Sequence, residues 1–353
     1  MNSHQRVKAA YEFKEPDRVP IFDAYWPETV ERWRTEGLPA DVSPWDHFDT
    51  DIRMITCIDH SLMLPEKIIE QTDEYIIKTD GYGITAKTFK HKTTTPHYMD
   101  FLIKTRQDWD KYRAKLSPSP DRIDWQSLKE EYAAWSKNQK YVLYGTLGLF
   151  ETCWRLVGFE NTLMQMVLDP DWLREIVEEI TNLLIATGDL LLELGVDFDG
   201  ILVSDDIAYK NGLLFSSTHL NELFVPCYKR FFGHFRKIGK TVTWHSDGKI
   251  SEAIPSLINA GINCLQPLEV KAGMDVRDLK MEYKHQLVLM GNIDVRIMAQ
   301  TKHDIEREIE SKLPTAMTGG GYIYHSDHSI PPEVSFENYC YVIDLIKRFG
   351  TYK

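Results

Sequence analysis

Histidines and carboxylates recur in a few short segments of the chain, at spacings that could hold a metal or move a proton. His245 and Asp247 are two residues apart in the segment TVTWHSD. Side chains at positions i and i+2 of a strand point to the same face, so the two could act as paired ligands or as a His–carboxylate dyad. With His328 they would offer two imidazoles and one carboxylate. That set suits catalytic Zn²⁺ with an open position or a non-haem Fe(II) triad, and the competing interpretation is hydrogen-bonded histidines without a metal.

Further acidic residues lie at the ends of predicted strands. Asp205 and Asp206 follow one apolar run, and Glu269 ends another. Burial could raise the pKa of such a carboxyl until it can donate a proton. Any single strand end is polar often enough by chance, but five polar ends together favour one shared site. These ends are residues 204–206, 245–248, 266–269, 291–294 and 325–328.

Short apolar strands alternate with helical patterns over the last two thirds of the chain. The expected strands are residues 141–147, 200–206, 241–247, 262–269, 286–294 and 322–327. The expected helices are residues 151–168, 171–194, 217–238, 250–260, 275–283, 303–313 and 336–349. This alternation indicates a parallel sheet. So many units without a Gly-rich phosphate turn favour an α/β fold of the (β/α)8 TIM-barrel class, in which the carboxyl ends of the strands carry the active site.

The first third of the chain is irregular and must supply the remaining strands. Residues 18–23 (RVPIFD) predict a first strand, and residues 51–57 are a weaker candidate. A hairpin is expected from residues 74–78 and 84–89, with two glycines between them. We expect one barrel domain over the whole chain, with an excursion around residues 60–120.

The composition excludes several classes of protein. Lys plus Arg number 41 and Asp plus Glu 53, which gives a net charge of −12 and disfavours nucleic acid as a partner. No apolar run approaches the ~18–20 residues of a membrane span. The first ten residues lack a signal-peptide core, and the five cysteines are scattered without a Cys-x-x-Cys pair. We therefore expect a cytoplasmic protein with reduced thiols that binds neither nucleic acid nor a membrane.

Aromatic residues make up 12% of the chain. Most are expected in the core, but some could line a pocket for a flat ligand. Tyr25, Trp26 and Trp154 lie near predicted strand ends or in the helices that follow, so we expect them to help enclose a small flat substrate. Asn292, at the end of a later strand, is a further candidate substrate contact.

Four segments of the second half form a recognisable series: GKTVTWHSDG, INCLQPLE, LVLMGNID and GGGYIYHSDHSIPPEVSFENY. Together with the opening RVKAAYEFKEPDRVPIFDAYW and the later FDTDI, they resemble the uroporphyrinogen decarboxylase superfamily. The resemblance covers nearly the whole chain. It implies a (β/α)8 barrel, in agreement with the strand count.

One branch of this superfamily, the true decarboxylases, binds a polycarboxylated porphyrinogen through an Arg-rich RQAGR loop soon after the first strand. Residues 23–34 (DAYWPETVERWR) stand at that place and lack the motif. The resemblance puts Asp51 at the decarboxylase aspartate and His328 at its histidine. It puts Cys153 at the decarboxylase tyrosine and the serine position near Asp206. The missing arginines and the acidic balance argue against a polyanionic porphyrinogen.

The other branch contains the cobamide-dependent methyltransferases, whose zinc ligands follow a His-x-Cys pattern with a second Cys before Ile/Ser-Pro. His245 matches the histidine, Asp247 stands at the first cysteine, and His328 stands at the second. Each replacement can still bind Zn²⁺, so the resemblance implies zinc or another divalent metal. Members of this branch that demethylate aryl methyl ethers use variant zinc motifs and need a flat aromatic pocket.

The resemblance therefore implies a methyltransferase that takes a methyl group from a small donor, with methoxylated aromatics favoured. The acceptor would be the Co(I) corrinoid of a partner protein, because the chain has no obvious room for a cobalamin domain. Either a metal acts as Lewis acid on the leaving oxygen, or Asp205, Asp206 or Glu269 donates a proton.

Two alternatives stay open at this point. A decarboxylase or other lyase would act on an aromatic or porphyrinogen-like acid and would use Asp51 and His328 for proton handling. A binding protein would retain the barrel without turnover. The superfamily includes both dimers and monomers, so a homodimer is compatible with the sequence.

Overall fold

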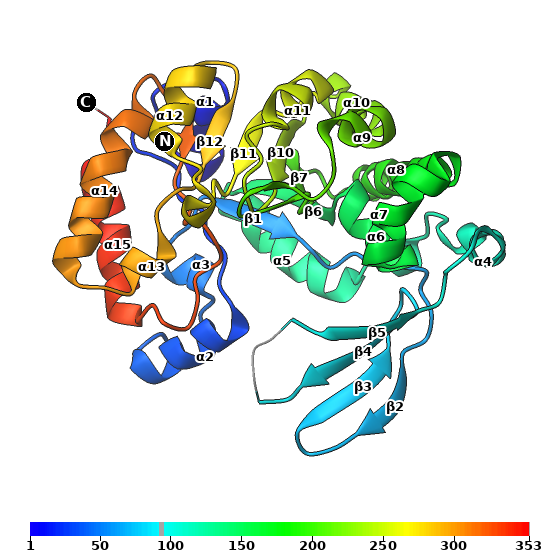
Figure 1. The fold of residues 1–353 in the computed structure, drawn as a ribbon. Helices are drawn as coiled ribbons and strands as arrows, with labels where there is room; N and C mark the ends of the chain where they lie inside the picture. Colours follow the sequence, from blue (N-terminus) through cyan, green and yellow to red (C-terminus); the bar gives the residue numbers. More distant parts are fainter. Residues whose placement is uncertain (92–94, 353) are drawn as a thin grey trace.

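A curled parallel sheet with helices around it forms the body of the molecule (Figure 1). The computed structural model describes residues 1–91 and 95–352. Within these residues the sheet has seven strands in the order β1, β6, β7, β10, β11, β12, β13. The strands are β1 Ile52–Ile55, β6 Tyr141–Leu147, β7 Gly200–Ser204, β10 Thr241–His245, β11 Cys264–Gln266, β12 Val288–Met290 and β13 Tyr322–Ile323.

The register of the central strands places their carboxyl ends side by side. Ser204 at the end of β7 pairs with His245 at the end of β10, and His245 pairs with Gln266 at the end of β11. Leu147 at the end of β6 pairs with Ser204 on the other side of β7. Residues that follow these strands therefore meet at one edge of the sheet, as the sequence predicted.

The sheet curls around its own apolar cluster. Ile52 of β1 and Ile323 of β13 come from opposite edges of the sheet, yet they belong to one buried cluster with Leu143, Leu202 and Val288 of the strands between. A flat sheet would hold its two edge strands far apart. A second, larger cluster fills the space between the sheet and the helices.

Residues 18–23, predicted as a first strand, lie between the two edges of the sheet but form only isolated bridges. Ile21 bridges Tyr324 in parallel, and its carbonyl accepts the Asp51 N–H at 2.7 Å. Pro20 has no N–H to donate, which interrupts the regular ladder.

Helices cover the outer face of the sheet, and the long predicted ones are divided in two places. Gly158, with φ of 92°, separates α6 from α7, and a π-helical turn at Leu220–Phe224 precedes α10. The helices of this layer are α5 Trp125–Lys137, α6 Leu149–Val157, α7 Phe159–Leu168, α8 Pro170–Glu193, α9 Ser217–His219, α10 Val225–Lys237, α11 Ile254–Ala260, α12 Val276–Tyr283, α13 Val295–Met298, α14 Lys302–Met317 and α15 Phe336–Phe349.

A four-stranded antiparallel sheet extends away from the body (Figure 1). It contains the predicted hairpin as β3 Tyr75–Thr79 and β4 Ile84–Phe89, flanked by β2 Lys67–Gln71 and β5 His97–Phe101. The remaining elements are α1 Ser3–Tyr11, α2 Pro27–Glu36, α3 Pro44–His47, α4 Arg106–Tyr112, β8 Ala208–Tyr209 and β9 Gly212–Leu213. No helix in the described part of the chain combines the length and apolar character that a bilayer crossing requires.

Candidate metal centre

Two aspartates and one histidine converge where β7 and β10 end. The side chains of Asp206, His245 and Asp247 offer ligand atoms that all lie within 4.8 Å of one another. The Asp247 N–H also donates to Asp206 Oδ1 at 2.8 Å, so the two loops hold each other in place. One imidazole nitrogen and two carboxylate oxygens are a donor set that suits Zn²⁺ or another divalent ion.

A buried hydrogen-bond chain fixes the orientation of His245. Burial lowers the pKa of His325, which keeps this imidazole neutral. Its Nδ1 lies 2.6 Å from the Ser326 carbonyl oxygen and must donate to it, so its Nε2 accepts from the Gln266 amide nitrogen at 3.0 Å. The Gln266 oxygen is then left to accept from His245 Nδ1. In the neutral tautomer that this chain selects, the proton lies on His245 Nδ1, and the lone pair of Nε2 faces Asp206 Oδ1 at 3.7 Å, the arrangement that a metal ligand requires.

Asp247 carries the second sign of a cation site. Its Oδ1 is buried and has no hydrogen-bond partner among the described residues. Burial, together with the neighbouring carboxylates of Asp206 and Glu269, raises the pKa of Asp247. A buried and unsatisfied oxygen is costly, and a bound cation would both satisfy it and offset the repulsion between carboxylates. The residues present therefore fit a divalent metal.

His328 lies beside this cluster rather than within it. Its Nε2 is 3.5 Å from Asp247 Oδ2, while its Nδ1 faces the Ser329 carbonyl oxygen at 3.1 Å. The indole of Trp26 is nearly parallel to the His328 ring, with centroids 6.1 Å apart. The sequence predicted His328 as the third metal ligand beside His245 and Asp247. In the structure, Asp206 is the third member of the cluster instead.

Asp205 is next to the cluster in sequence but is used by the backbone of α6. It is fully buried and accepts hydrogen bonds from the N–H groups of Phe150 and Glu151 and from the Tyr228 hydroxyl. Burial raises its pKa to about 7. Gly148 is required here, because a Cβ at that position would lie 2.2 Å from the Asp205 side chain.

Glu269 and Asp327 organise the loops around the cluster. Glu269 accepts the Gly248 N–H at 2.8 Å and pairs with Lys271 at 2.6 Å. Asp327, which sequence reasoning did not select, accepts two backbone N–H groups of the loops after β11 and β12 at 3.0 and 2.9 Å. Burial raises the pKa of Asp327 to about 6.

Asp51 lies at the opposite end of the sheet, because it precedes β1 instead of following it. Its buried carboxylate pairs with Arg6 at 2.6 Å and Arg18 at 2.7 Å, and it accepts the Ile21 N–H at 2.8 Å. These contacts tie the N-terminal segment to the sheet. The structure therefore does not bring Asp51 together with Asp247 or His328.

Of the predicted substrate contacts, only Trp26 lies beside the cluster. The Tyr25 hydroxyl lies 3.2 Å from that of Tyr339, and its ring packs against the buried Trp33. Trp154 packs against Tyr98 of β5, which anchors the antiparallel sheet to α6. Asn292 is buried and donates to the carbonyl oxygens of residues 268 and 274, so it holds loops together.

A cavity of about 310 Å³ opens at the carboxyl ends of β1, β6 and β7. Ser204, the residue before Asp205, forms part of its wall, which brings the cavity next to the cluster. His60 and Tyr82 reach it from the irregular first third, a contribution that sequence reasoning missed. The cavity lining described here contains Asp59 as a charged side chain and neither Lys nor Arg.

The sequence of the chain matches one known family. The family model "Uroporphyrinogen decarboxylase (URO-D)" matches residues 81–349. The match covers well over half of the chain, and the chain therefore belongs to the uroporphyrinogen decarboxylase family.

Individual relatives are distant. A uroporphyrinogen decarboxylase of Idiomarina loihiensis is 26% identical over 200 residues, which cover 55% of this chain and 52% of the relative. One of Vesicomyosocius okutanii is 23% identical over 196 residues, covering 54% and 53%. The chain thus spans about half the length of the curated relatives it matches. A solved methyltransferase from Methanosarcina mazei has the same fold, with a TM-score of 0.72, 15% identity and 99% coverage of both chains.

Proposed function

We propose that this protein is a metal-assisted methyltransferase that moves a methyl group from a small neutral donor to the Co(I) corrinoid of a partner protein. The observation that carries the proposal is the Asp206–His245–Asp247 cluster, with a cavity beside it that offers no cationic side chain in the described lining. The shared fold with a methyltransferase supports the same direction.

The character of the cavity supports this function over porphyrinogen decarboxylation. A substrate with many carboxylates needs cations to replace its hydration, whereas Asp59 would repel it. A volume of about 310 Å³ is at the small end of ligand pockets, which suits a single aromatic ring better than a tetrapyrrole. A methoxylated aromatic fits both the charge and the size.

The chain's own residues would prepare the leaving oxygen. Asp206, His245 and Asp247 would hold Zn²⁺ or another divalent ion, which supplies Lewis-acid assistance at an ether oxygen, an effect worth several kcal/mol. Gln266 and His325 keep His245 Nε2 directed at the carboxylates. His328 can deliver a proton to the leaving oxygen and, being 29% exposed, regain it from solvent. Trp26 offers a flat face beside His328.

The proposal also covers the closure of the barrel, the cellular compartment and the oligomeric state. We place residues 18–23 as the eighth strand that closes a (β/α)8 barrel. The five cysteines are free, which fits the cytoplasm. A homodimer is compatible with this arrangement.

The test is incubation of the protein with zinc, a reduced corrinoid protein and a panel of methoxyaromatics, followed through the corrinoid absorption spectrum. We expect methylation with at least one donor and its loss in Asp247→Ala. Corrinoid methylation that is equally fast in Asp247→Ala would contradict the proposed site.

The second candidate, decarboxylation, is favoured by the names of the matched relatives. It predicts CO₂ release from an aromatic or porphyrinogen-like acid without any corrinoid. Such release, with no methyl transfer to cobalt from any donor, would replace the methyltransferase proposal.

A further inference from the structure

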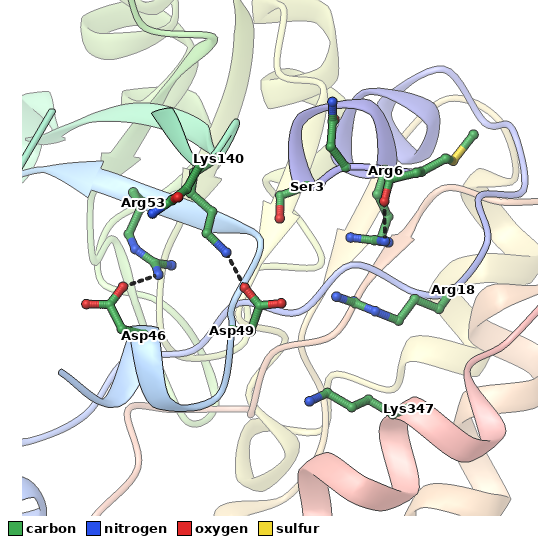
Figure 2. Close-up of a pocket in the computed structure, with 11 residues that line it drawn as sticks. Ser3, Arg6, Arg18, Asp46, Asp49, Arg53, Lys140 and Lys347 are labelled. Atoms are coloured by element: carbon green, nitrogen blue, oxygen red, sulfur yellow. Dashed lines mark hydrogen bonds and ion pairs between the residues drawn. The ribbon is translucent and has the colours of Figure 1, made fainter. Parts of the chain in front are cut away.

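Figure 2 shows the residues that line a second cavity, of about 660 Å³. This cavity lies at the opposite end of the sheet from the metal centre. Its wall includes Lys347 near the end of α15 and three basic residues at the amino ends of strands or extended segments, Arg18, Arg53 and Lys140. The residues of the metal centre lie instead at the carboxyl ends of their strands. The two sites are therefore separated by the length of the sheet, and neither the family match nor the proposed reaction assigns a role to this cavity.

The cavity is positively charged although the chain as a whole is acidic. Five basic side chains line it, against two carboxylates, Asp46 and Asp49. Both carboxylates lie at the rim, with 61% and 74% of their side chains exposed. The buried Asp51 and the partly exposed Asp17, neither of them in the lining, neutralise Arg6 and part of Arg18. Positive charge remains in excess, in a protein of net charge −12.

Three of the basic side chains point into the same space from different elements and keep unused donors (Figure 2). Lys347 has no ion pair within residues 1–91 and 95–352. Lys140 donates to Asp49 and to the Thr50 carbonyl oxygen, which leaves one of its three donors free. Arg18 donates from its two Nη atoms to the two Asp51 carboxylate oxygens and from one of them also to the Val19 carbonyl oxygen, which leaves its Nε hydrogen and one Nη hydrogen free.

Arg6 and Arg53 make this arrangement rigid. Arg53 is 6% exposed and donates to Asp46 and to three backbone carbonyl oxygens around the α3–β1 turn. Arg6 is 9% exposed and holds Asp17 and Asp51. The free donors of Arg18 and Lys140 are thus presented by a preorganised wall, which reduces the entropic cost of binding an anion.

We propose that this cavity binds the phosphate group of a small phosphorylated molecule. Separate donors that converge from three directions match a tetrahedral, doubly charged oxyanion, to which lysine binds as a point charge. A carboxylate would favour the planar edge of Arg18, which Asp51 already occupies. The cavity is larger than free phosphate needs, and the rim carboxylates can accept hydroxyl groups of an attached organic part.

Isothermal titration of the full chain at low salt tests this assignment, with inorganic phosphate, glycerol 3-phosphate, malonate and glycerol as separate probes. We expect saturable binding of the two phosphate compounds and none of glycerol or malonate. Lys347→Gln should weaken binding about tenfold, since it removes one charged contact. The matched control is Arg348→Gln, which removes the same charge one residue along α15 from a side chain paired with Glu306. This control should change the affinity less than twofold.

The two phosphate probes separate the sources of the ligand. If glycerol 3-phosphate binds more tightly than inorganic phosphate, the ligand is a phosphate ester. If the two affinities are equal, the site recognises the phosphate group alone, as free phosphate would present it. Both results support the site. The proposal is overturned if neither phosphate compound binds saturably at millimolar concentration. Equal affinities of the wild type and Lys347→Gln, or a preference for malonate, would overturn it as well.

Discussion

Gln266 should control metal affinity although it is not itself a ligand. Its side-chain oxygen accepts from His245 Nδ1, and its nitrogen donates to His325 Nε2. Replacement by leucine keeps the volume similar but removes both contacts. His245 can then place its proton on Nε2, the nitrogen that faces Asp206.

The size of the effect follows from this arrangement. Loss of an outer-shell partner of a metal-bound histidine typically lowers affinity by about 10- to 100-fold. That corresponds to about 1.4–2.8 kcal/mol of binding free energy. Gln266 is 5% exposed, so the two imidazole nitrogens would also lose their partners in a buried place, at about 1–3 kcal/mol of folding stability each.

The assay is competition for Zn²⁺ against a chromophoric chelator, under conditions where unfolding curves show each variant to be folded. Gln266→Glu is the matched control, because it keeps the acceptor for His245 and loses the donor to His325, and the negative charge that it adds favours a nearby cation. We expect Gln266→Leu to bind zinc at least tenfold more weakly and Gln266→Glu to lose less. Wild-type affinity in Gln266→Leu, or an equal loss in both variants, would refute the assignment of the His245 tautomer.

Three further predictions concern single residues. Asp247→Asn should lower zinc affinity by more than the Gln266 variants do, as measured by the same competition, because it replaces an anionic ligand by a neutral amide. Asp51→Asn should leave the activity of the folded protein unchanged but lower the free energy of unfolding in urea by about 3 kcal/mol, because Arg6 and Arg18 lose their buried partner; a catalytic loss with unchanged stability would favour a decarboxylase role. Burial lowers the pKa of His60 from 6.5 to about 4, so the unfolded state takes up a proton that the native state refuses between these pH values. Stability should therefore fall by up to about 3 kcal/mol as the pH drops from about 6.5 to about 4, and His60→Gln should flatten this part of the unfolding profile.

The fold was predictable where apolar runs and helical patterns alternate. The strand at residues 141–147 and the helix at residues 336–349 have the predicted bounds in the structure. Residues 18–23 were harder, because their apolar pattern is that of a strand but Pro20 limits hydrogen bonding to isolated bridges. Strands β2 and β5 were missed because they pair with the predicted hairpin through contacts that local patterns do not encode.

The sequence predicted the location of the candidate site, at the carboxyl edge of the sheet, but not the full set of its residues. Alternation along a strand grouped His245 with Asp247, and the structure places the two close together, but the choice between Asp206 and His328 depends on loop conformations after the strands. Gln266 and His325 lie in two of the polar strand ends that the sequence marked, but their role as positioning groups gave no signal, since a buried amide and imidazole take that role only when the register brings them together.

The catalytic role predicted for Asp51 disagrees with its position in the structure. The family resemblance assigned it a catalytic place from its sequence context, whereas the structure pairs it with two arginines at the amino end of β1. A carboxylate's role depends on which end of its strand it occupies. The sequence pattern at residues 51–57 indicated the strand only weakly, whereas β1 begins at Ile52, directly after Asp51.

The proposed function depends above all on a metal ion held by Asp206, His245 and Asp247. Anomalous diffraction at the zinc absorption edge, on crystals grown with zinc, tests for this ion. We expect a peak bounded by these three side chains, about 2.0–2.2 Å from the His245 nitrogen and the carboxylate oxygens. A map without a peak at this position, or with zinc bound only elsewhere, would contradict it.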